Sequence, residues 1–543
     1  MRIVELLAAT LALAPSTAAF DPLEATIAST HHDLYTGLTT CREIVESFIS
    51  RIESLNNRTN AIIALNPYAL GDADDCDKKL AANNGTYGRL FGIPILLKDN
   101  FDTSFMPTTG ANADMAHSQP TVDAPSVAAF KNAGAIILGK TNLHELALEG
   151  ISVSSLGGQT INPYDSTRTP GGSSGGTGAA IAASFAVWGT GTDTVNSLRS
   201  PASANSLWSL RPTRGLISRA GVIPISYTQD TIGPIARCVQ DVATALTVMA
   251  EGEYDAEDNV TALVPAGIKG TDYGASLSAG SLKGLRFGLL EGFFNRTASD
   301  ETTPVNDAMR MQVEKIRRAG ATVVPINDTI YDANKIISAL DVQRYEYREE
   351  LTKYLQKPSL SGIHPNSTEE LYASDKFLVL PSGYEYVTRS LVSSTANASY
   401  DTALAGIQNL TLALQKTFVA SQLDALIYPE QKNLVVKLGS PSQSGRNGIL
   451  AALTGSPVVT VPAGFSPATD TAPDGVPIGM EILGRQWTEQ KLLQIAYQIE
   501  QLGRVRKTPS WARQRVNVRN YTSVPTIVPN VGNIPDEYPL GQL

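Results

Sequence analysis

The residues between 170 and 201 are the first candidates for chemistry in this sequence. Residues 170–178 read Pro-Gly-Gly-Ser-Ser-Gly-Gly-Thr-Gly, and a second Gly/Thr/Ser-rich loop spans 189–201. Glycines free in φ, with serines between them, describe a backbone folded tightly around a site. A flexible linker would not continue into the apolar run 179–188 and a second ordered loop. The second loop also holds Asp193, Ser197 and Arg199.

A serine nucleophile needs a base, and the sequence offers two alternatives. Residues 171–175 match Gly-x-Ser-x-Gly, the nucleophile elbow of α/β-hydrolases, with Ser173 at its centre. That chemistry requires a histidine later in the chain, and only His364 follows, in a loop-like segment. The other candidate is Lys98, directly after the apolar run 93–97, where burial would lower the amine's pKa and keep it neutral. The Ser-His-Asp interpretation is therefore the runner-up.

Other motifs in the chain do not predict a bound cofactor. Residues 134–141 formally match the phosphate-binding pattern Gly-x4-Gly-Lys-Thr. The spacer Ala-Ile-Ile-Leu belongs in a buried strand, whereas a phosphate loop needs a turn whose amides face the anion. The five histidines show neither His-Glu-x-x-His nor Cys/His spacing. We therefore expect no nucleotide, no metal and no other cofactor.

The segments around the two loops predict one large α/β domain. Helix 40–56 begins with a capping box formed by Thr40 and Glu43. Strand, helix and strand then alternate in a rhythm that suggests parallel pairing. Strands are expected at 93–97, 134–139, 285–290, 322–326, 423–428 and 458–461, and further helices at 126–132, 304–320 and 488–502. No break in composition divides the body of the chain.

Composition limits the classes of partner. The chain has 543 residues, 42% of them hydrophobic and 17% charged, which permits a large buried core. Its net charge of −9 argues against a nucleic-acid partner, which usually needs a basic face. No internal apolar run reaches the length of a membrane span. We expect neither nucleic-acid binding nor a membrane span, and the oligomeric state stays open.

The N-terminus resembles a targeting segment. Met1-Arg2 is followed by a stretch at 3–14 that is apolar apart from Glu5 and Thr10, and small residues at 17 and 19 suit cleavage before Phe20. A buried first helix is the alternative. Nine Asn-x-Ser/Thr sequons support export: Asn57, Asn84, Asn259, Asn295, Asn327, Asn366, Asn397, Asn409 and Asn520. The prediction is a secreted, extracellular N-glycosylated protein with a signal peptide at 1–19.

The three cysteines allow two interpretations. Cys41 and Cys76 could form a disulfide in an oxidising compartment, which would leave Cys238 as a buried thiol. Alternatively, all three are small residues of the core. The sequence does not decide between these interpretations.

Taken together, the motifs resemble the amidase signature family over about residues 40–505. The segments that carry the resemblance, in order, are 92–94, Lys98-Asp99, 139–142, 171–176, 191–193, 197–201, 211–213, 229–234 and 484–485. The resemblance implies a mixed β-sheet core covered by α-helices. We expect the amidase domain to span 20–520. Past Tyr521 the chain is rich in Pro and Val without a period, which indicates a C-terminal tail over 521–543 that packs on the surface.

The resemblance assigns roles to three side chains. Ser197 would be the acyl-forming nucleophile, Ser173 a bridging serine that follows a cis peptide, and Lys98 the base. The implied function is a secreted serine amidohydrolase that cleaves a carboxamide of a small-molecule substrate through an acyl-enzyme. Two alternatives are an esterase with the same triad and a binding protein on a decayed amidase scaffold. A third, a component of an amidotransferase, fits poorly with export.

Two departures from the family pattern bear on the site. Backbone amides from Thr194 to Ser197 should form the oxyanion hole, but Val195 and Asn196 stand where the family usually has two glycines. Because valine resists positive φ, we expect a negative φ at Val195 and an Asn196 side chain whose hydrogen bonds brace the loop. Phe105, where glycine is common, either narrows the acyl site or packs in the core. Pocket walls are expected around 100–120, 340–400 and 430–450.

Overall fold

A central mixed β-sheet organises the chain. The computed structural model describes residues 20–82 and 87–543, and within them eleven strands form one sheet in the order β1-β4-β2-β7-β9-β8-β14-β15-β13-β10-β11. The predicted signal peptide, 1–19, lies outside the described residues. The strands are β1 Ile62–Leu65, β2 Pro94–Lys98, β4 Ile136–Thr141, β7 Trp188–Asp193, β8 Trp208–Arg211, β9 Thr231–Ala236, β10 Arg286–Leu290, β11 Thr322–Ile326, β13 Ala425–Pro429, β14 Val458–Phe465 and β15 Pro477–Leu483.

The sheet is parallel only in two places. β2 pairs in parallel with β4 and β7, and β10 pairs in parallel with β11 and β13. The remaining pairs, including β7 with β9 and β14 with β15, are antiparallel. The two parallel regions contain the strand–helix–strand alternation that is visible in the sequence. The predicted single α/β domain with a mixed sheet is confirmed.

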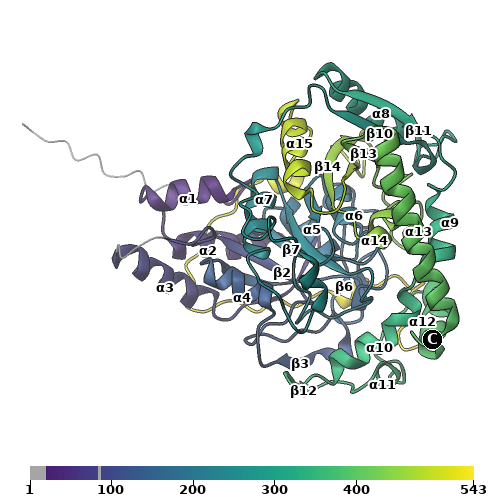
Figure 1. The fold of residues 1–543 in the computed structure, drawn as a ribbon. Helices are drawn as coiled ribbons and strands as arrows, with labels where there is room; N and C mark the ends of the chain where they lie inside the picture. Colours follow the sequence, from purple (N-terminus) through teal and green to yellow (C-terminus); the bar gives the residue numbers. More distant parts are fainter. Residues whose placement is uncertain (1–19, 83–86) are drawn as a thin grey trace, which may run out of the picture.

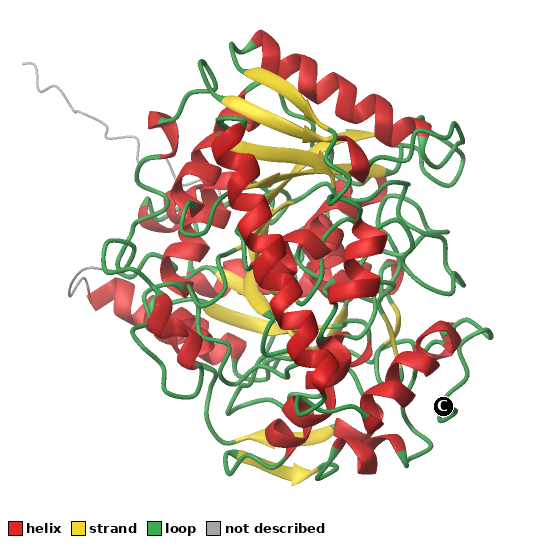
Figure 2. Ribbon diagram, turned by 45° about the vertical axis from the view of Figure 1, so that its right-hand side comes forward, coloured by secondary structure: helices red, strands yellow, loops and turns green. Residues whose placement is uncertain are grey.

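Helices cover both faces and the edges of this sheet (Figures 1 and 2). They are α1 Ile27–Tyr35, α2 Cys41–Leu55, α3 Ala69–Ala82, α4 Pro125–Asn132, α5 Gly175–Ala182, α6 Arg199–Ala204, α7 Val239–Met249, α8 Thr303–Arg318, α9 Ala333–Leu340, α10 Gln343–Leu355, α11 Thr368–Tyr372, α12 Tyr384–Val392, α13 Ala398–Ala420, α14 Ile449–Thr454 and α15 Glu489–Gln501. Two small ribbons, β3 His117–Pro120 with β12 Leu360–Ile363 and β5 Val153–Ser154 with β6 Gly158–Gln159, complete the described fold. Among the described residues, no helix is long and apolar enough to cross a membrane.

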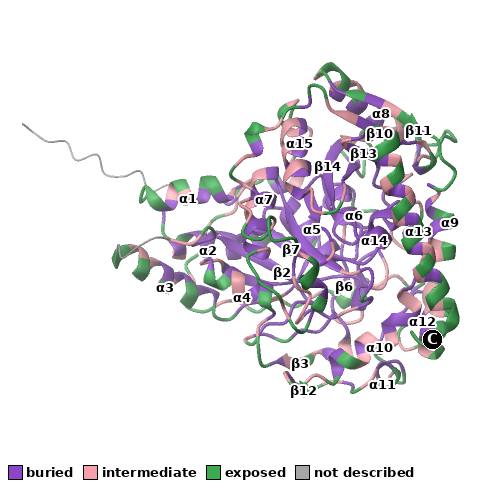
Figure 3. Ribbon diagram, viewed as in Figure 1, coloured by how far each residue is buried: buried purple, intermediate pink, exposed green. Residues whose placement is uncertain are grey.

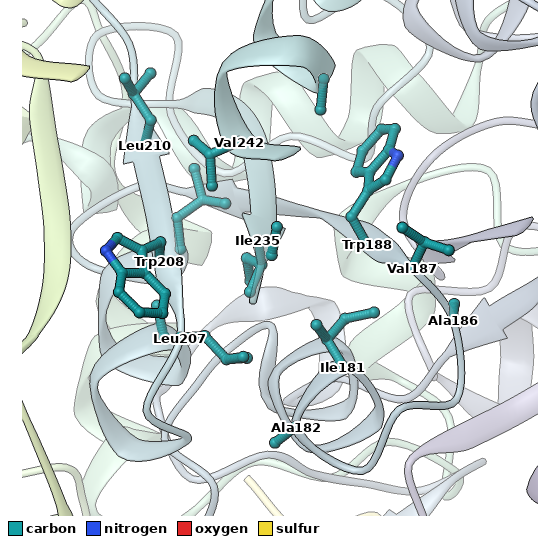
Figure 4. Close-up of a cluster of buried hydrophobic side chains, with 14 of the residues drawn as sticks. Ile181, Ala182, Ala186, Val187, Trp188, Leu207, Trp208, Leu210, Ile235 and Val242 are labelled. Atoms are coloured by element: carbon teal, nitrogen blue, oxygen red, sulfur yellow. The ribbon is translucent and has the colours of Figure 1, made fainter. Parts of the chain in front are cut away.

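The centre of the molecule is built from small residues packed beside large aromatic side chains. All of α5 and α6 is buried, and both helices lie in the purple interior of Figure 3. Because α5 consists mostly of glycine and alanine, its backbone approaches β7 closely. Trp188, which begins β7, is buried in the apolar cluster that Figure 4 shows. Its ring packs edge-on against Phe130, with ring centroids 5.2 Å apart. The close packing of α5 on β7 brings the turn before α5 next to the loop after β7.

Several local expectations are confirmed. α2 starts with the capping box, in which the Thr40 hydroxyl accepts the Glu43 N–H and the Glu43 carboxylate accepts the Thr40 N–H. The phosphate-loop pattern is strand β4, where the Lys140 ammonium is buried and donates to the Phe101 carbonyl at 2.8 Å. Its amides therefore form a sheet and do not surround an anion.

The cysteines are present as unbonded thiols in this structure. Cys41 and Cys76 are buried, and Cys238 is partly buried. The first two lie beside Gly92, whose φ is +72° and whose added Cβ would come within 3.0 Å of the Cys41 sulfur. This arrangement corresponds to the interpretation in which the cysteines are small core residues.

The C-terminal segment packs against the body of the protein. The Asn530 N–H donates to the Asn60 side chain at 3.0 Å, and the ring of Tyr538 is buried. Leu540 pairs with Leu378 in an isolated bridge. The division at residue 520 remains a prediction.

Candidate active site

Lys98 is the last residue of β2 and is fully buried. Its Nζ lies 2.8 Å from Ser173 Oγ and 2.7 Å from Thr192 Oγ1, so the amine is within hydrogen-bond distance of two hydroxyls. Burial lowers the pKa of Lys98 to about 7, although the negative charges of Asp193 and Asp230 act in the opposite direction. A substantial fraction of this amine is therefore neutral at neutral pH.

Ser173 stands in the turn that leads into α5. The Gly172–Ser173 peptide bond is cis, as the family resemblance implies. Gly171 has a φ of +68°, and a Cβ there would meet the Ser200 hydroxyl at 2.7 Å, so only glycine fits. The Ser152 hydroxyl holds this turn by donating to the Gly171 carbonyl at 2.8 Å and accepting the Gly175 N–H at 3.1 Å. Several independent contacts therefore position the Ser173 hydroxyl.

Ser197 lies in the loop between β7 and α6, and it is 7% exposed, whereas Ser173 and Lys98 are 0% exposed. Its carbonyl accepts the Ser174 N–H at 3.3 Å, which joins the two loops. Among the described residues, no hydrogen bond links the Ser197 hydroxyl to Ser173. The structure thus brings Lys98 and Ser173 into contact and places Ser197 beside them.

A buried ion network fixes the Ser197 loop. The Asp193 carboxylate accepts the Leu198 N–H at 3.0 Å, Arg199 Nε at 3.0 Å and Arg211 Nη1 at 2.7 Å. Burial opposes ionisation of Asp193, but the two guanidinium groups hold its pKa below the usual range. Arg199 Nη1 also donates to both carboxylate oxygens of Glu481, at 2.9 and 3.1 Å. The loop is therefore anchored at both ends by charges that water does not reach.

The backbone of this loop presents unused donors. Within the described part of the chain, none of the N–H groups of residues 194–197 donates to a protein acceptor. Val195 has a negative φ, as predicted, and its side chain packs in the apolar cluster that includes α14. The Asn196 side chain points inward and donates to Glu430 Oε1 at 3.1 Å, also as predicted. The two non-glycine residues are thus compatible with a loop whose amides stay free.

Gly448, just before α14, is pressed against the same loop. A Cβ on Gly448 would lie 2.2 Å from the Val195 carbonyl oxygen and 2.6 Å from the Asn196 Cβ. Its φ of −66° is ordinary, so the requirement for glycine here is purely one of space. The Arg199 guanidinium donates to both the Gly448 and Val195 carbonyls and ties the two backbones together.

A cleft of about 1060 Å³ lies beside the start of the loop, although neither Ser173 nor Ser197 lines it. Thr192 and Thr194 contribute to its wall, and Thr192 connects it directly to Lys98. The other walls come from residues 219–232, 256–259, 348–359 and Glu369. Of the predicted wall segments, only 340–400 contributes. Segments 100–120 and 430–450 do not line the cleft, and segment 219–232 does so without having been predicted.

Phe105 does not narrow this cleft. It is partly buried, packs against the main core and lines a separate cavity of about 700 Å³ near α3 and α4. The Lys131 ammonium lies 5.0 Å from the centre of its ring. Of the two interpretations of this departure from the family pattern, the packing role is the one that fits.

The histidines are not arranged as bases for Ser173. His364 Nδ1 contacts the carbonyl of its neighbour Pro365 at 2.8 Å. His144 donates its backbone N–H to the Ser173 carbonyl at 3.0 Å, but its ring Nδ1 has no partner among the described residues. Burial lowers the pKa of His144 to about 4, so this ring is neutral. Among the described residues, the only basic group in contact with the Ser173 hydroxyl is Lys98.

Sequence reasoning missed the roles of Thr192, Glu430 and Gly448. For Thr192 a signal existed: Thr190 and Thr192 alternate along β7 and share one face. Thr190 Oγ1 accepts the Lys98 N–H at 3.0 Å, and Thr192 contacts the Lys98 amine. Glu430 and Gly448 reach the site only through long-range packing, for which no local pattern exists.

Comparisons with known proteins agree with this geometry. A family model described as Amidase matches residues 43–493. A glutamyl-tRNA(Gln) amidotransferase subunit from Acinetobacter baumannii (strain AYE) is 31% identical over an alignment that covers 85% of this chain and 92% of the relative. The corresponding protein of Alkaliphilus metalliredigens (strain QYMF) is 32% identical and covers 87% and 95%.

Solved structures show the same relationship. The peptide amidase of Stenotrophomonas maltophilia is 33% identical, with a TM-score of 0.77 over 90% of this chain and 98% of that one. An amidase family protein from Bacillus anthracis str. Ames is 28% identical, also with a TM-score of 0.77, over 90% and 93%. The mixed-sheet fold and these relatives define an enzyme that hydrolyses carbon–nitrogen bonds. The chain belongs to the amidase family, and it is an amidase-signature amidohydrolase.

The close approach of Gly448 to the loop generates a testable prediction. Gly448→Ala should force the backbone of 195–196 to move and lower kcat by about 10²-fold, because small displacements of catalytic groups have effects of that size. Steady-state kinetics on a chromogenic amide, with a thermal melt to verify folding, measures this. Gly71→Ala is the matched control, since a Cβ at Gly71 in α3 meets nothing within 4 Å. An unchanged kcat in Gly448→Ala would show that the loop tolerates displacement.

Proposed function

We propose that this enzyme hydrolyses small carboxamides through an acyl-enzyme on Ser197, with Ser173 as the bridging serine and Lys98 as the base. One observation carries the assignment: a buried lysine with a pKa near 7 contacts the Ser173 hydroxyl, beside a loop whose amides are free. Lysine acts as a general base only when its environment keeps it neutral, and burial provides that environment here.

The first step is proton relay with nucleophilic attack. The neutral Lys98 amine takes the Ser173 hydroxyl proton while Ser173 takes the proton of Ser197. The Ser197 oxygen forms a bond to the carbonyl carbon, and the carbonyl π electrons move to the oxygen. The free N–H groups of 194–197 stabilise that oxyanion, and each such donor contributes about 10²–10³ in rate. Catalytic hydrogen bonds often tighten only when substrate is bound, which accounts for the open Ser173–Ser197 contact.

The second half of the reaction returns the proton. As the tetrahedral intermediate collapses, the C–N bond breaks and the relay delivers the Lys98 proton through Ser173 to the leaving nitrogen. The product amine then departs and leaves an ester on Ser197. Water attacks this ester, gives its proton to the same relay and restores the free Ser197 hydroxyl. The balance requires no cofactor.

The proposed substrate is a carboxamide, either non-peptide or terminal. A cleft of about 1060 Å³ accommodates an extended small molecule, and one similar structure is named a peptide amidase. Esters would react through the same groups. A binding protein on a decayed scaffold is disfavoured because all three side chains are present and Lys98 contacts Ser173. The amidotransferase relatives suggest a second candidate, an ammonia-releasing component of a complex.

We further propose that the protein is secreted and N-glycosylated. All eight sequon asparagines within the described residues are exposed; the ninth, Asn84, lies outside them. Exposure is not general for asparagine in this protein, since ten of the others are buried: Asn56, Asn60, Asn66, Asn100, Asn112, Asn142, Asn162, Asn196, Asn205 and Asn447. Oligosaccharide attachment requires an accessible amide, so the exposure of the sequons supports their use.

Ser197→Ala tests the nucleophile. It should abolish labelling by a serine-reactive fluorophosphonate and lower turnover by several orders of magnitude, since a triad without its nucleophile retains only residual activity. Mass spectrometry of labelled peptides identifies the modified serine. Label found on Ser174 or another serine in the mutant would contradict the assignment. Hydrolysis by the purified chain alone separates a free-standing amidase from a component that needs partners.

The pH profile tests the base. With a Lys98 pKa near 7, kcat/KM should rise about tenfold per pH unit below pH 7, because only the neutral amine accepts the proton. Lys98→Arg keeps the positive charge but cannot act as a base, so it should be inactive throughout. His364→Ala serves as the control and should behave like the wild type. Activity lost in His364→Ala and retained in Lys98→Arg would support the Ser-His-Asp interpretation.

Export and glycosylation are tested by expression in a secreting eukaryotic host. The protein should appear in the medium with Phe20 at its N-terminus, and peptide N-glycosidase should lower its apparent mass. Replacing the nine sequon asparagines with glutamine should remove that mass shift. Retention inside the cells with Met1 intact would refute the proposal.

A further inference from the structure

Glu430, which follows β13, is a buried carboxyl group with no cation. Its side chain is 0% exposed, and Oε1 accepts only the neutral amide of Asn196, at 3.1 Å. Oε2 has no hydrogen-bond partner among the described residues. None of the ion pairs between described residues includes Glu430. A carboxylate in such a place would be strongly destabilised, so the group is held in its protonated form.

The charges around Glu430 are balanced without it. Arg199 and Arg211 provide two positive charges, and Asp193 and Glu481 provide two negative ones, all of them in mutual ion pairs. An ionised Glu430 would add a third negative charge to this group. Burial, followed by the negative charge of Glu481, raises the pKa of Glu430 to about 8, which Arg199 only partly offsets.

The groups that face Glu430 come from four directions. They are Glu481 on β15, Arg199 on α6, Asp193 at the end of β7, and Tyr428 on β13, whose hydroxyl pKa burial raises well above its usual value. Burial raises the pKa of Glu481 too, but the two hydrogen bonds from Arg199 favour its ionised form. Glu430 receives no such bond from a cation, so it is the carboxyl group of this set that is held protonated near neutral pH.

Glu430 is also held rigidly beside the nucleophile loop. Its N–H donates to the Gly479 carbonyl at 3.1 Å, and its carbonyl accepts the Asn447 N–H at 3.0 Å. Asn447 immediately precedes Gly448, the residue in close contact with the loop. Glu430 thus reaches the loop through the hydrogen bond from Asn196, and the segment 447–448, which is bonded to Glu430, reaches it through steric contact.

We propose that neutral Glu430 is a positioning residue for acyl transfer. It fixes Asn196, and through it the donors of the oxyanion hole, without placing a negative charge beside them. Its ionisation would oppose the developing oxyanion, because charges interact strongly in a water-excluded interior. This inference rests on the proposed Ser197 mechanism and adds to it a second titration that switches activity off at alkaline pH.

The test compares pH profiles of four proteins between about pH 6 and 10. The wild type should give a bell-shaped kcat, with a rising limb from Lys98 and a falling limb near pH 8. Glu430→Gln keeps the shape of the protonated acid and an oxygen that can accept the Asn196 amide, but it cannot ionise. Its kcat profile should therefore keep the rising limb and lose the falling limb. Glu489→Gln, the same change at a buried carboxyl on α15 that accepts the Thr213 N–H, should keep both limbs.

Glu430→Ala leaves the Asn196 amide without its acceptor. Its kcat should fall about 10²-fold with little change in KM, and Glu430→Gln should restore it. If Glu430→Ala does not fold in a thermal melt, the Gln comparison alone decides. Normal Ser197 labelling with a falling limb that persists in Glu430→Gln overturns the role of Glu430 only. Absence of Ser197 labelling in the wild type overturns the proposed function together with this inference.

Discussion

The burial of one lysine amine determines most of what surrounds it. Lys98 Nζ has no contact with water, and the hydroxyls of Ser173 and Thr192 replace its solvation. Placing a charge there would cost several kcal/mol, so the amine is held near its neutral form. β2 must therefore end in the interior, and the turn before α5 must present a hydroxyl at hydrogen-bond distance. The small residues of α5 follow from the same requirement, since a bulkier helix would hold that turn away from β2.

A second constraint acts on the Ser197 loop, and it concerns the charges that surround this loop. The network of Asp193, Arg199, Arg211 and Glu481 is completely buried and neutral as a whole. Breaking one partner of such a network leaves an unpaired buried charge, which costs about 3–5 kcal/mol. The network therefore specifies one loop conformation more strongly than it stabilises the fold. It leaves the N–H groups of 194–197 free, because the loop is held by side chains and carbonyls and not by its own amides.

The sequence predicted local structure well and long-range structure poorly. The capping box of α2, the strand that ends at Lys98 and the helix after Pro304 were all visible, because periodicity and caps are encoded within a few residues. The family resemblance indicated the mixed sheet. The negative φ of Val195 could be predicted because β-branched residues avoid positive φ values. The cleft wall at 219–232 was not predicted, since it depends on where a loop packs after folding. The same limit applied to Glu430, which meets Asn196 across 234 residues of sequence.

Val195 and Asn196 show how a loop can function without the glycines that are usual there. Two glycines would leave the loop free to adopt many conformations, whereas this chain restricts it by contacts from outside. Val195 gains apolar contacts with the cluster at α14, and Asn196 gains an acceptor in Glu430. The space for both comes from Gly448, so in this chain the segment packed against the loop requires a glycine. Rigidity in this loop is thus a property of the packing between segments, because the contacts that restrict Val195 and Asn196 come from outside the loop.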